Sequence, residues 1–339
     1  MKQLVFRMSS LGDLILSTAF LENLPEGIEL DWVISSDFEF VLKGHPKIKR
    51  LIVFDKKTGI RGWIELLRLL ALENYQKRID LHGTIRTAVA RLYFLGSDLL
   101  RGRSVAWTGI SKQRARMIAY FALKQALPKN FRPSPIWQRF AQMAGGDRPP
   151  SYLPILNARA LDEQEILKRY QLESRKYYAL MPASRWSSKE WGAKRYAGLA
   201  EEIKCERGMS LLLLGRESDR ACIEVQDFLR ARNIPYVAAL RENDFSVTAV
   251  LLKHAISYVG SDTGLAHLSE AVGSKSAVIF GPTRPELGFG PFRKESLSVH
   301  ANVWCSPCSK DGRICYRLTD RYACLNRITV EQVKQELFR

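Results

Sequence analysis

The segment Ser9 to Asp13 carries residues that could bind an anion or move a proton. The segment MKQLVFRM at 1–8 precedes it and an apolar-periodic stretch up to Leu24 follows it, which predicts a short strand, a loop and a helix. Such a loop directs backbone N–H groups and the positive end of a helix dipole at a ligand. Asp13 is therefore either an acid that stabilises the first helical turn or a catalytic carboxylate. The loop lacks the spacing of a P-loop or a dinucleotide-binding turn, which argues against an ATPase or a dinucleotide-dependent oxidoreductase.

A second polar turn lies between the apolar segment 256–259 and the predicted helix 266–272. Its hydroxyl and backbone N–H groups would face a phosphate at the helix N-terminus. The residues that supply them are Asp262, Thr263, Gly264 and Leu265. Asp262 could instead be an ordinary N-cap, and His267 a core or capping histidine.

Two further turns follow apolar segments of the second half, one at Ser184 with Lys189 downstream and one at Glu217. A lysine supplies positive charge for a leaving diphosphate, and a carboxylate at a strand end can bind ribose hydroxyls. Taken singly, each of these residues is a weak indication of function.

Four cysteines near the end of the chain follow the spacing C-x2-C-x6-C-x8-C. They are Cys305, Cys308, Cys315 and Cys324. Four thiolates at such spacing suit a tetrahedral structural zinc ion. The alternative is a set of free or locally paired thiols, since stable disulfides are disfavoured in the cytoplasm.

The elements that must position these residues form two series in which strands alternate with helices. The first series has predicted strands at 1–8, 30–35, 51–54 and 78–81, with a helix at 62–75. The second has strands at 177–181, 210–214, 236–238, 256–259 and 276–280, with helices at 193–207, 219–232 and 266–272. Gly and Pro accumulate at 144–154, which predicts a linker between a domain of residues 1–150 and one of 151–339. The fold class is therefore α/β, with two parallel-sheet domains and a ligand-binding cleft between them.

Composition agrees with two folded domains and adds a strong charge bias. The chain has 339 residues, of which 46% are hydrophobic and 26% charged, so wholesale disorder is excluded. The net charge is +17, and residues 56–139 hold 17 Lys and Arg against four acids. That segment is either a set of solvated helix faces or a surface for a polyanion. No apolar run is long enough to cross a bilayer and no signal peptide is recognisable, so we expect a cytoplasmic protein.

Several motifs, taken in order, resemble one family. They are SSLGD near residue 10, DLHG at 80–83 with Arg86, PASRWSSKEWGAKRY, Gly215-x-Glu217, SDTGLAHLSEAVG, FGPTRP and the terminal cysteines. Together they resemble the ADP-heptose:lipopolysaccharide heptosyltransferases, inverting glycosyltransferases of GT-B architecture. The resemblance implies two Rossmann-like domains, an acceptor-binding N-terminal half and an ADP-sugar-binding C-terminal half. It also implies no catalytic metal, and action at the inner face of the inner membrane.

The resemblance assigns a role to each candidate residue. Asp13 corresponds to the general base that takes the proton from the acceptor hydroxyl, and Ser9 and Ser10 to the acceptor-side loop. Lys189 and Ser184 correspond to contacts with the donor diphosphate. The remaining donor-side residues are Glu217 on the ribose and Asp262, Thr263, Gly264, Leu265 and His267 on the diphosphate and sugar.

The resemblance also gives the basic segment a partner. A lipid-linked, phosphorylated saccharide acceptor would be held by Arg61, Arg86 and their neighbours, and helices such as 62–75 could rest on lipid. Alternatively, Trp63 and the leucines at helical spacing from it pack against the sheet.

Two other functions compete with heptose transfer. One is a GT-B glycosyltransferase that uses another nucleotide-sugar donor or another cell-surface glycan acceptor. The other is a nucleic-acid-binding protein that uses the basic segment, but no nucleic-acid-binding module is recognisable, so we expect no nucleic acid partner.

Overall fold

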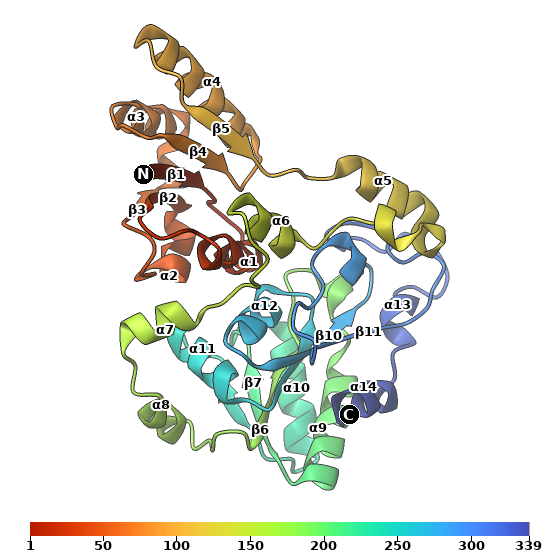
Figure 1. The fold of residues 1–339 in the computed structure, drawn as a ribbon. Helices are drawn as coiled ribbons and strands as arrows, with labels where there is room; N and C mark the ends of the chain where they lie inside the picture. The colour runs from red at the N-terminus through yellow and green to blue at the C-terminus, as the bar shows by residue number, and fades with distance from the viewer. Residues whose placement is uncertain (339) are drawn as a thin grey trace. The chain divides into compact units, whose positions relative to one another are not determined.

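The computed structural model describes residues 1–338 and divides the chain into two compact units. Unit 1 comprises residues 1–112 and 136–160, and unit 2 comprises residues 113–135 and 161 onward. Each unit has its own parallel β-sheet with helices (Figure 1), so the predicted α/β fold with two parallel-sheet domains is confirmed.

The sheet of unit 1 has five parallel strands in the order β3-β2-β1-β4-β5. Their bounds are β1 Lys2–Phe6, β2 Glu29–Ser35, β3 Arg50–Phe54, β4 Lys77–Asp80 and β5 Ala106–Gly109. In the central strand, Val5 is buried and lies opposite Trp32 of β2 and Ile79 of β4. A parallel sheet covered on both faces requires near-continuous apolar strands, which is the pattern that the sequence shows here.

Six helices complete unit 1: α1 Leu11–Glu22, α2 Glu39–Leu42, α3 Gly59–Ala71, α4 Ile85–Leu100, α6 Ile136–Met143 and α7 Leu153–Arg159. Helix α1 is buried from Leu14 to Leu21 and packs against α6. Helices α3 and α4 cover the sheet face that carries Phe6, against which Trp63 and Phe94 pack. The alternative that Trp63 packs against the sheet is therefore confirmed.

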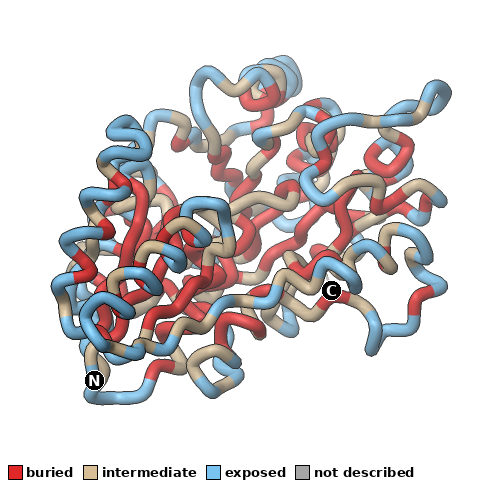
Figure 2. The backbone as a smooth tube through the Cα atoms, turned by 90° about the horizontal axis from the view of Figure 1, so that it is seen from above, coloured by how far each residue is buried: buried red, intermediate tan, exposed pale blue. Residues whose placement is uncertain are grey.

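The sheet of unit 2 has six parallel strands in the order β11-β10-β9-β6-β7-β8. Their bounds are β6 Tyr177–Met181, β7 Ser210–Leu214, β8 Val237–Ala239, β9 Ser257–Ser261, β10 Lys275–Phe280 and β11 Leu297–His300. Leu180 of β6 is buried between Val259 and Leu213 of its neighbours. Figure 2 shows that the buried backbone is concentrated in the strands and the helix faces that cover them.

The described residues of unit 2 form eight helices: α5 Arg114–Leu123, α8 Glu163–Arg169, α9 Ala193–Arg207, α10 Arg220–Ala231, α11 Phe245–His254, α12 Gly264–Ala271, α13 Ala323–Asn326 and α14 Val330–Phe338. Trp191, just before α9, is fully buried and donates its indole N–H to the backbone oxygen of Ile328 at 2.9 Å. This contact joins the start of α9 to the C-terminal segment that leads into α14.

The predicted division at residue 150 is wrong in two respects. Helix α5 belongs to unit 2, because Tyr120 and Leu127 pack against Leu287 and Arg132 forms an ion pair with Glu286.

The predicted linker at 144–154 belongs to unit 1. Asn23 of unit 1 exchanges two hydrogen bonds with the backbone of Arg148, and the N–H of Ser151 donates to the Thr18 hydroxyl. Residues up to 160 therefore pack with the first sheet. Within residues 1–338, no helix is both long and apolar enough to span a membrane.

Candidate functional site

Asp13 lies in the first turn of α1, at the edge of the unit 1 sheet where the strands end. Its carboxylate is held from two sides. The Ser10 hydroxyl donates to Oδ2 at 2.9 Å, and Arg7 Nη2 lies 2.6 Å from the same oxygen. The Asp13 side chain keeps 24% of its surface exposed, whereas Arg7 is buried and also donates to the backbone oxygen of Leu81. Asp13 is thus an oriented, solvent-accessible carboxylate beside a fixed cation.

Further basic groups surround this carboxylate. Burial lowers the pKa of Arg139 to about 10, and the charge of Asp13 opposes that shift. Burial and then the charge of Arg7 lower the pKa of His82 to about 3, so this imidazole is neutral at physiological pH. Asp80 shapes the turn before α4 by accepting the N–H groups of His82 and Gly83 at 2.8 and 2.7 Å. Arg7 and Arg139 are thus two cations near Asp13, and they suit an anionic ligand, whereas the neutral His82 adds no charge.

The other predicted acceptor-side residues lie on the same edge of the sheet. Ser9 and Ser10 form the loop between β1 and α1, and Ser10 contacts Asp13. Arg86 is exposed in the first turn of α4, 6.0 Å from the Phe54 ring, and its charge acts on His82. Arg61 is exposed in the first turn of α3 and forms no ion pair within residues 1–338. The structure therefore brings Ser10 to Asp13 and Arg86 near His82, whereas no interaction within residues 1–338 joins Arg61 to these residues.

On unit 2, three predicted or neighbouring residues form one network where the strands end. Lys189 Nζ lies 2.8 Å from Asp262 Oδ2 and also donates to the Asp262 backbone oxygen at 2.6 Å. The Thr283 hydroxyl donates to Asp262 Oδ2 at 3.1 Å. Lys189 and Asp262 side chains are only 12% and 13% exposed. The network therefore holds an ammonium group in a fixed, poorly hydrated position, where it is paired with Asp262 and has a third N–H to donate to a ligand.

Helix α12 begins beside this network and carries no side-chain cap. Its N-cap residue is Thr263, whose hydroxyl pairs with the Tyr258 hydroxyl at 3.1 Å instead of with the first helical turn. The interpretation of Asp262 as the N-cap is therefore wrong, because its carboxylate binds Lys189 and Thr283. Without a capping side chain, the first-turn N–H groups at Gly264 and Leu265 face an anion-binding position.

The remaining donor-side residues occupy different environments. His267 is buried in α12, as expected of a core histidine. Ser184 follows β6, and its backbone N–H donates to Glu190 Oε1 at 3.0 Å. Burial raises the pKa of the Glu190 carboxyl, and the hydrogen bond from Ser184 opposes this rise. Glu217, after β7, is exposed and accepts from Arg241 Nε at 2.5 Å. Glu217 is thus placed by an arginine that the sequence reasoning missed.

Gly215 begins the turn that carries Glu217, and only glycine suits this position. Its φ is +145°, and a Cβ atom there would lie 2.4 Å from the Cys222 sulfur. Glycine therefore lets the turn pass close to the Cys222 side chain of α10 just before Glu217.

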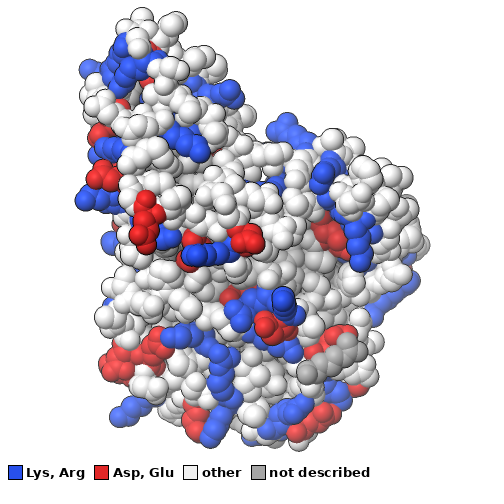
Figure 3. All heavy atoms as spheres, viewed as in Figure 1, with Lys and Arg blue, Asp and Glu red and all other residues white. Residues whose placement is uncertain are grey.

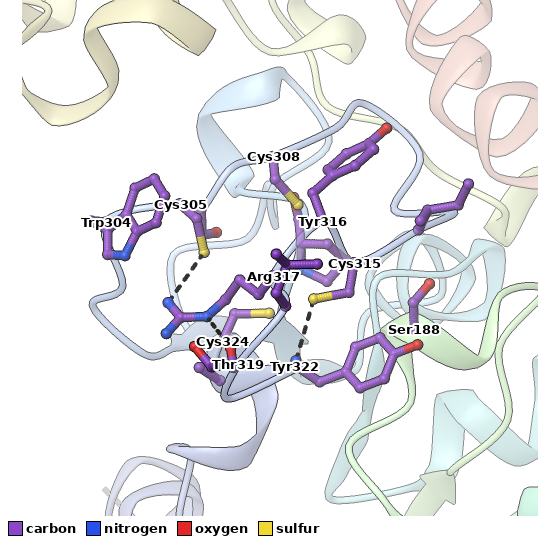
Figure 4. Close-up of a pocket in the computed structure, with 15 residues that line it drawn as sticks. Ser188, Trp304, Cys305, Cys308, Cys315, Tyr316, Arg317, Thr319, Tyr322 and Cys324 are labelled. Atoms are coloured by element: carbon purple, nitrogen blue, oxygen red, sulfur yellow. Dashed lines mark hydrogen bonds between the residues drawn. The ribbon is translucent and has the colours of Figure 1, made fainter.

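The four predicted metal ligands line one pocket of about 340 Å³ (Figure 4). Figure 4 shows their sulfur atoms spaced around the pocket, with the Arg317 side chain among them. Arg317 donates to Cys305 Sγ at 3.9 Å, and the Tyr322 N–H donates to Cys315 Sγ at 3.4 Å. Burial, followed by the other three thiols, raises the pKa of Cys324 to about 12. The thiols thus lie near one another, but within residues 1–338 no three potential ligands converge on a metal position.

Comparison with known proteins identifies the family to which this chain belongs. The sequence pattern of "Glycosyltransferase family 9 (heptosyltransferase)" matches residues 63–317, three quarters of the chain. Lipopolysaccharide heptosyltransferase 1 of Pseudomonas aeruginosa is 24% identical over an alignment 384 positions long, which covers 99% of this chain and 97% of that protein.

Two solved structures from E. coli share the fold. Heptosyltransferase WaaC with ADP has a TM-score of 0.68 at 19% identity, covering 99% of this chain and 98% of that one. ADP-heptose lps heptosyltransferase II has a TM-score of 0.71 at 17% identity, covering 100% of this chain and 98% of that one. Because the family pattern spans well over half of the sequence, the chain belongs to glycosyltransferase family 9, the heptosyltransferase family.

Proposed function

We propose that this protein is an inverting glycosyltransferase that moves a heptose from ADP-heptose to a lipopolysaccharide inner-core acceptor. The observation that carries the proposal is the lysine held beside an uncapped helix N-terminus in a chain of this family. A fixed ammonium and free first-turn N–H groups are what a departing nucleoside diphosphate needs. The names of the relatives, which specify ADP, heptose and lipopolysaccharide, support the choice of substrates.

The donor would bind where the unit 2 strands end. Its diphosphate would lie against Lys189 and the α12 N-terminus, with Thr263, Gly264 and Leu265 supplying hydroxyl and N–H donors and Ser184 and His267 nearby. Glu217 would accept hydrogen bonds from the ribose hydroxyls in place of its present contact with Arg241.

Transfer would proceed by a single displacement. Asp13 takes the proton from the acceptor hydroxyl as that oxygen attacks the anomeric carbon, and the bond from that carbon to the ADP oxygen breaks. Attack from the face opposite the leaving group inverts the configuration. Lys189 and the helix N-terminus stabilise the negative charge that develops on ADP, so the reaction as proposed needs no catalytic metal.

The acceptor would be held by unit 1. Arg7, Arg139 and Arg86 give the Asp13 surroundings a positive charge that suits a phosphorylated, acidic saccharide. Ser9, Ser10 and Arg61 would supply further polar contacts. Because the acceptor is lipid-linked, we propose that the protein works in the cytoplasm, peripherally bound to the inner face of the inner membrane.

A ligand screen tests the donor assignment. The melting temperature and calorimetric affinity of the full-length protein are measured with ADP-heptose, ADP, UDP, GDP and a short DNA duplex. We expect selective stabilisation by the two adenine ligands, and weaker binding in Glu217→Ala, which removes the proposed ribose contact. Arg220→Ala, which removes an exposed ion pair with Glu224 on α10, is the matched control.

The other outcomes of the screen distinguish the alternatives. Preference for UDP or GDP would keep the reaction class and overturn the heptose donor. Binding of the DNA duplex alone would contradict the transferase proposal altogether.

We also propose that the four cysteines at the pocket of Figure 4 hold a structural zinc ion, which would require their side chains to converge and Arg317 to leave Cys305. Elemental analysis of protein produced with added zinc is expected to show about one zinc per chain. Cys305→Ser with Cys308→Ser should abolish it, whereas Cys205→Ser, an exposed cysteine outside the pocket, should not. Wild-type protein that contains no metal, and whose four pocket thiols all react with an alkylating reagent, would overturn the proposal. Because the proposed zinc is structural and not catalytic, a chelator added to the assay should leave turnover unchanged.

A further inference from the structure

Helix α4 exposes an apolar stripe along its length. Ile85, Leu92, Leu95 and Leu99 are between 68% and 85% exposed, with the small Ala88 between the first two. Residues at this spacing lie on one side of a helix. The opposite side of α4 is also apolar, but there Ala90 and Phe94 are buried against the sheet. Helix α4 therefore has two apolar sides, one packed in the core and one exposed to solvent.

The neighbouring helix α3 also exposes single apolar side chains, but the exposed acid Glu65 shares the side of Leu69 and Leu72. Ile60, Leu69 and Leu72, in or just after α3, are each 58% to 62% exposed. Both helices pack on the same sheet face through Trp63 and Phe94, so they form one outer layer of unit 1. Large exposed apolar areas on a soluble protein mark interaction sites.

The charged residues of α4 indicate what kind of partner its apolar stripe would bind. Arg86 lies in the first turn of α4, Arg91 in the middle and Arg101 directly after its end, and all three are exposed. The single acid of α4, Asp98, is buried and ion-paired with Arg78. On the face shown in Figure 3, the part of unit 1 around α4 is mainly uncharged with Lys and Arg and little acid. By helical spacing Arg91 borders the stripe, whereas Arg86, over the Phe54 ring, and Arg101, which donates to the backbone oxygen of Ala71, lie on the other side of α4. An exposed apolar stripe with Arg91 beside it and no exposed acid on α4 complements an anionic lipid surface.

A second copy of the chain fits this surface less well. Pairing α4 with another α4 would bring the Arg91 side chains of the two helices together, and α4 has no exposed acid to neutralise them. Like charges brought face to face disfavour association. A nucleic acid would use the cations but would leave the leucines exposed.

The position of α4 links this surface to the proposed acceptor site. The helix begins immediately after the turn that carries His82, whose pKa is affected by Arg7 and Asp13. The N-terminal end of the stripe is therefore at the sheet edge where Asp13 lies.

We propose that the exposed apolar stripe of α4 seats unit 1 on an anionic bilayer, so that a lipid-linked saccharide reaches Asp13 while its lipid stays in the membrane. The role in acceptor delivery rests on the proposed function, whereas lipid binding itself does not.

Vesicle sedimentation of the full-length protein tests the proposal. The variant Leu92→Gln/Leu95→Gln/Leu99→Gln changes only exposed side chains and keeps good helix formers. We expect it to bind phosphatidylglycerol-containing vesicles at least about 10-fold more weakly than wild type. The matched control, Ile223→Gln/Phe228→Gln, changes partly exposed apolar residues of α10 on unit 2 and should bind as wild type does. Neutral phosphatidylcholine vesicles should bind wild type weakly.

Two further measurements separate this inference from the proposed function. Heptose transfer to an acceptor in vesicles should fall in the triple variant, but transfer to a short acceptor without lipid chains should not. Unchanged vesicle binding in the triple variant would overturn the inference even if transfer is normal. A wild-type dimer that the triple variant converts to monomer, measured by light scattering, would overturn it in favour of self-association. Absence of any transfer to the soluble acceptor in wild type would instead count against the proposed function and leave the vesicle result to stand by itself.

Discussion

Replacing Asp13 with Asn is expected to lower the rate of transfer by about 100- to 10,000-fold, the usual contribution of a general base. The amide keeps the size of the carboxylate and can still accept the Ser10 hydrogen bond, but it cannot take a proton from the acceptor. Steady-state kinetics with a soluble acceptor measures the loss. Calorimetric affinity for ADP should stay at the wild-type value, because the donor contacts are proposed for unit 2.

The control for this prediction is Asp37→Asn. Asp37 is an exposed acid of unit 1 that pairs with Lys56 at 2.9 Å, far along the chain from the proposed base. We expect normal turnover in this variant. If Asp13→Asn keeps most of its activity while folding normally, another group takes the proton and the assignment of Asp13 is wrong.

Replacing Lys189 with Met is expected to weaken ADP binding by about 10- to 100-fold, the effect of losing one hydrogen bond to a charged group. Turnover should fall further, by about 100- to 1000-fold, because the diphosphate gains negative charge as it leaves. Removing the lysine also leaves the Asp262 carboxylate facing the donor phosphates with only the Thr283 hydroxyl as partner. Calorimetry with ADP and steady-state kinetics measure the two effects separately.

Two variants test whether the positive charge of Lys189 is responsible for ADP binding and turnover. Lys189→Arg keeps the positive charge and should recover part of the ADP affinity. Lys204→Met removes an exposed lysine of α9 and should change neither affinity nor rate. An ADP affinity that is equal in wild type and Lys189→Met would exclude Lys189 from the donor site.

Most of the fold could be predicted because the strands of a covered parallel sheet are apolar throughout. The run SLLLL of β7 is an example. The strands that sequence analysis missed, β5 and β11, lie at the sheet edges and are only partly buried, so they lack such a run. The unit to which α5 belongs could not be predicted either, because it depends on contact between Tyr120 and the distant Leu287.

Some residues of the candidate site could likewise be predicted from the sequence, and others could not. Residues in turns after strands, such as Lys189 and Asp262, could be chosen because parallel strands bring all their carboxyl ends to one edge. Arg7 and Arg241 were missed because their importance depends on partners, Asp13 and Glu217, that only the folded chain identifies. The stripe on α4 was missed because apolar residues on two sides of a helix do not reveal which side faces the core.

The assignment of α5 to unit 2 has a consequence for how this chain can be divided. The backbone passes between the units at 112–113, 135–136 and 160–161, so no single cut yields either unit whole. A fragment that ends at residue 150 would contain Tyr120 without the Leu287 that covers it, and the complementary fragment would lack α5. Neither unit can therefore be expressed, exchanged with that of a relative or fused to a reporter as one uninterrupted piece of sequence. Chimaeras of this protein need junctions at all three crossings.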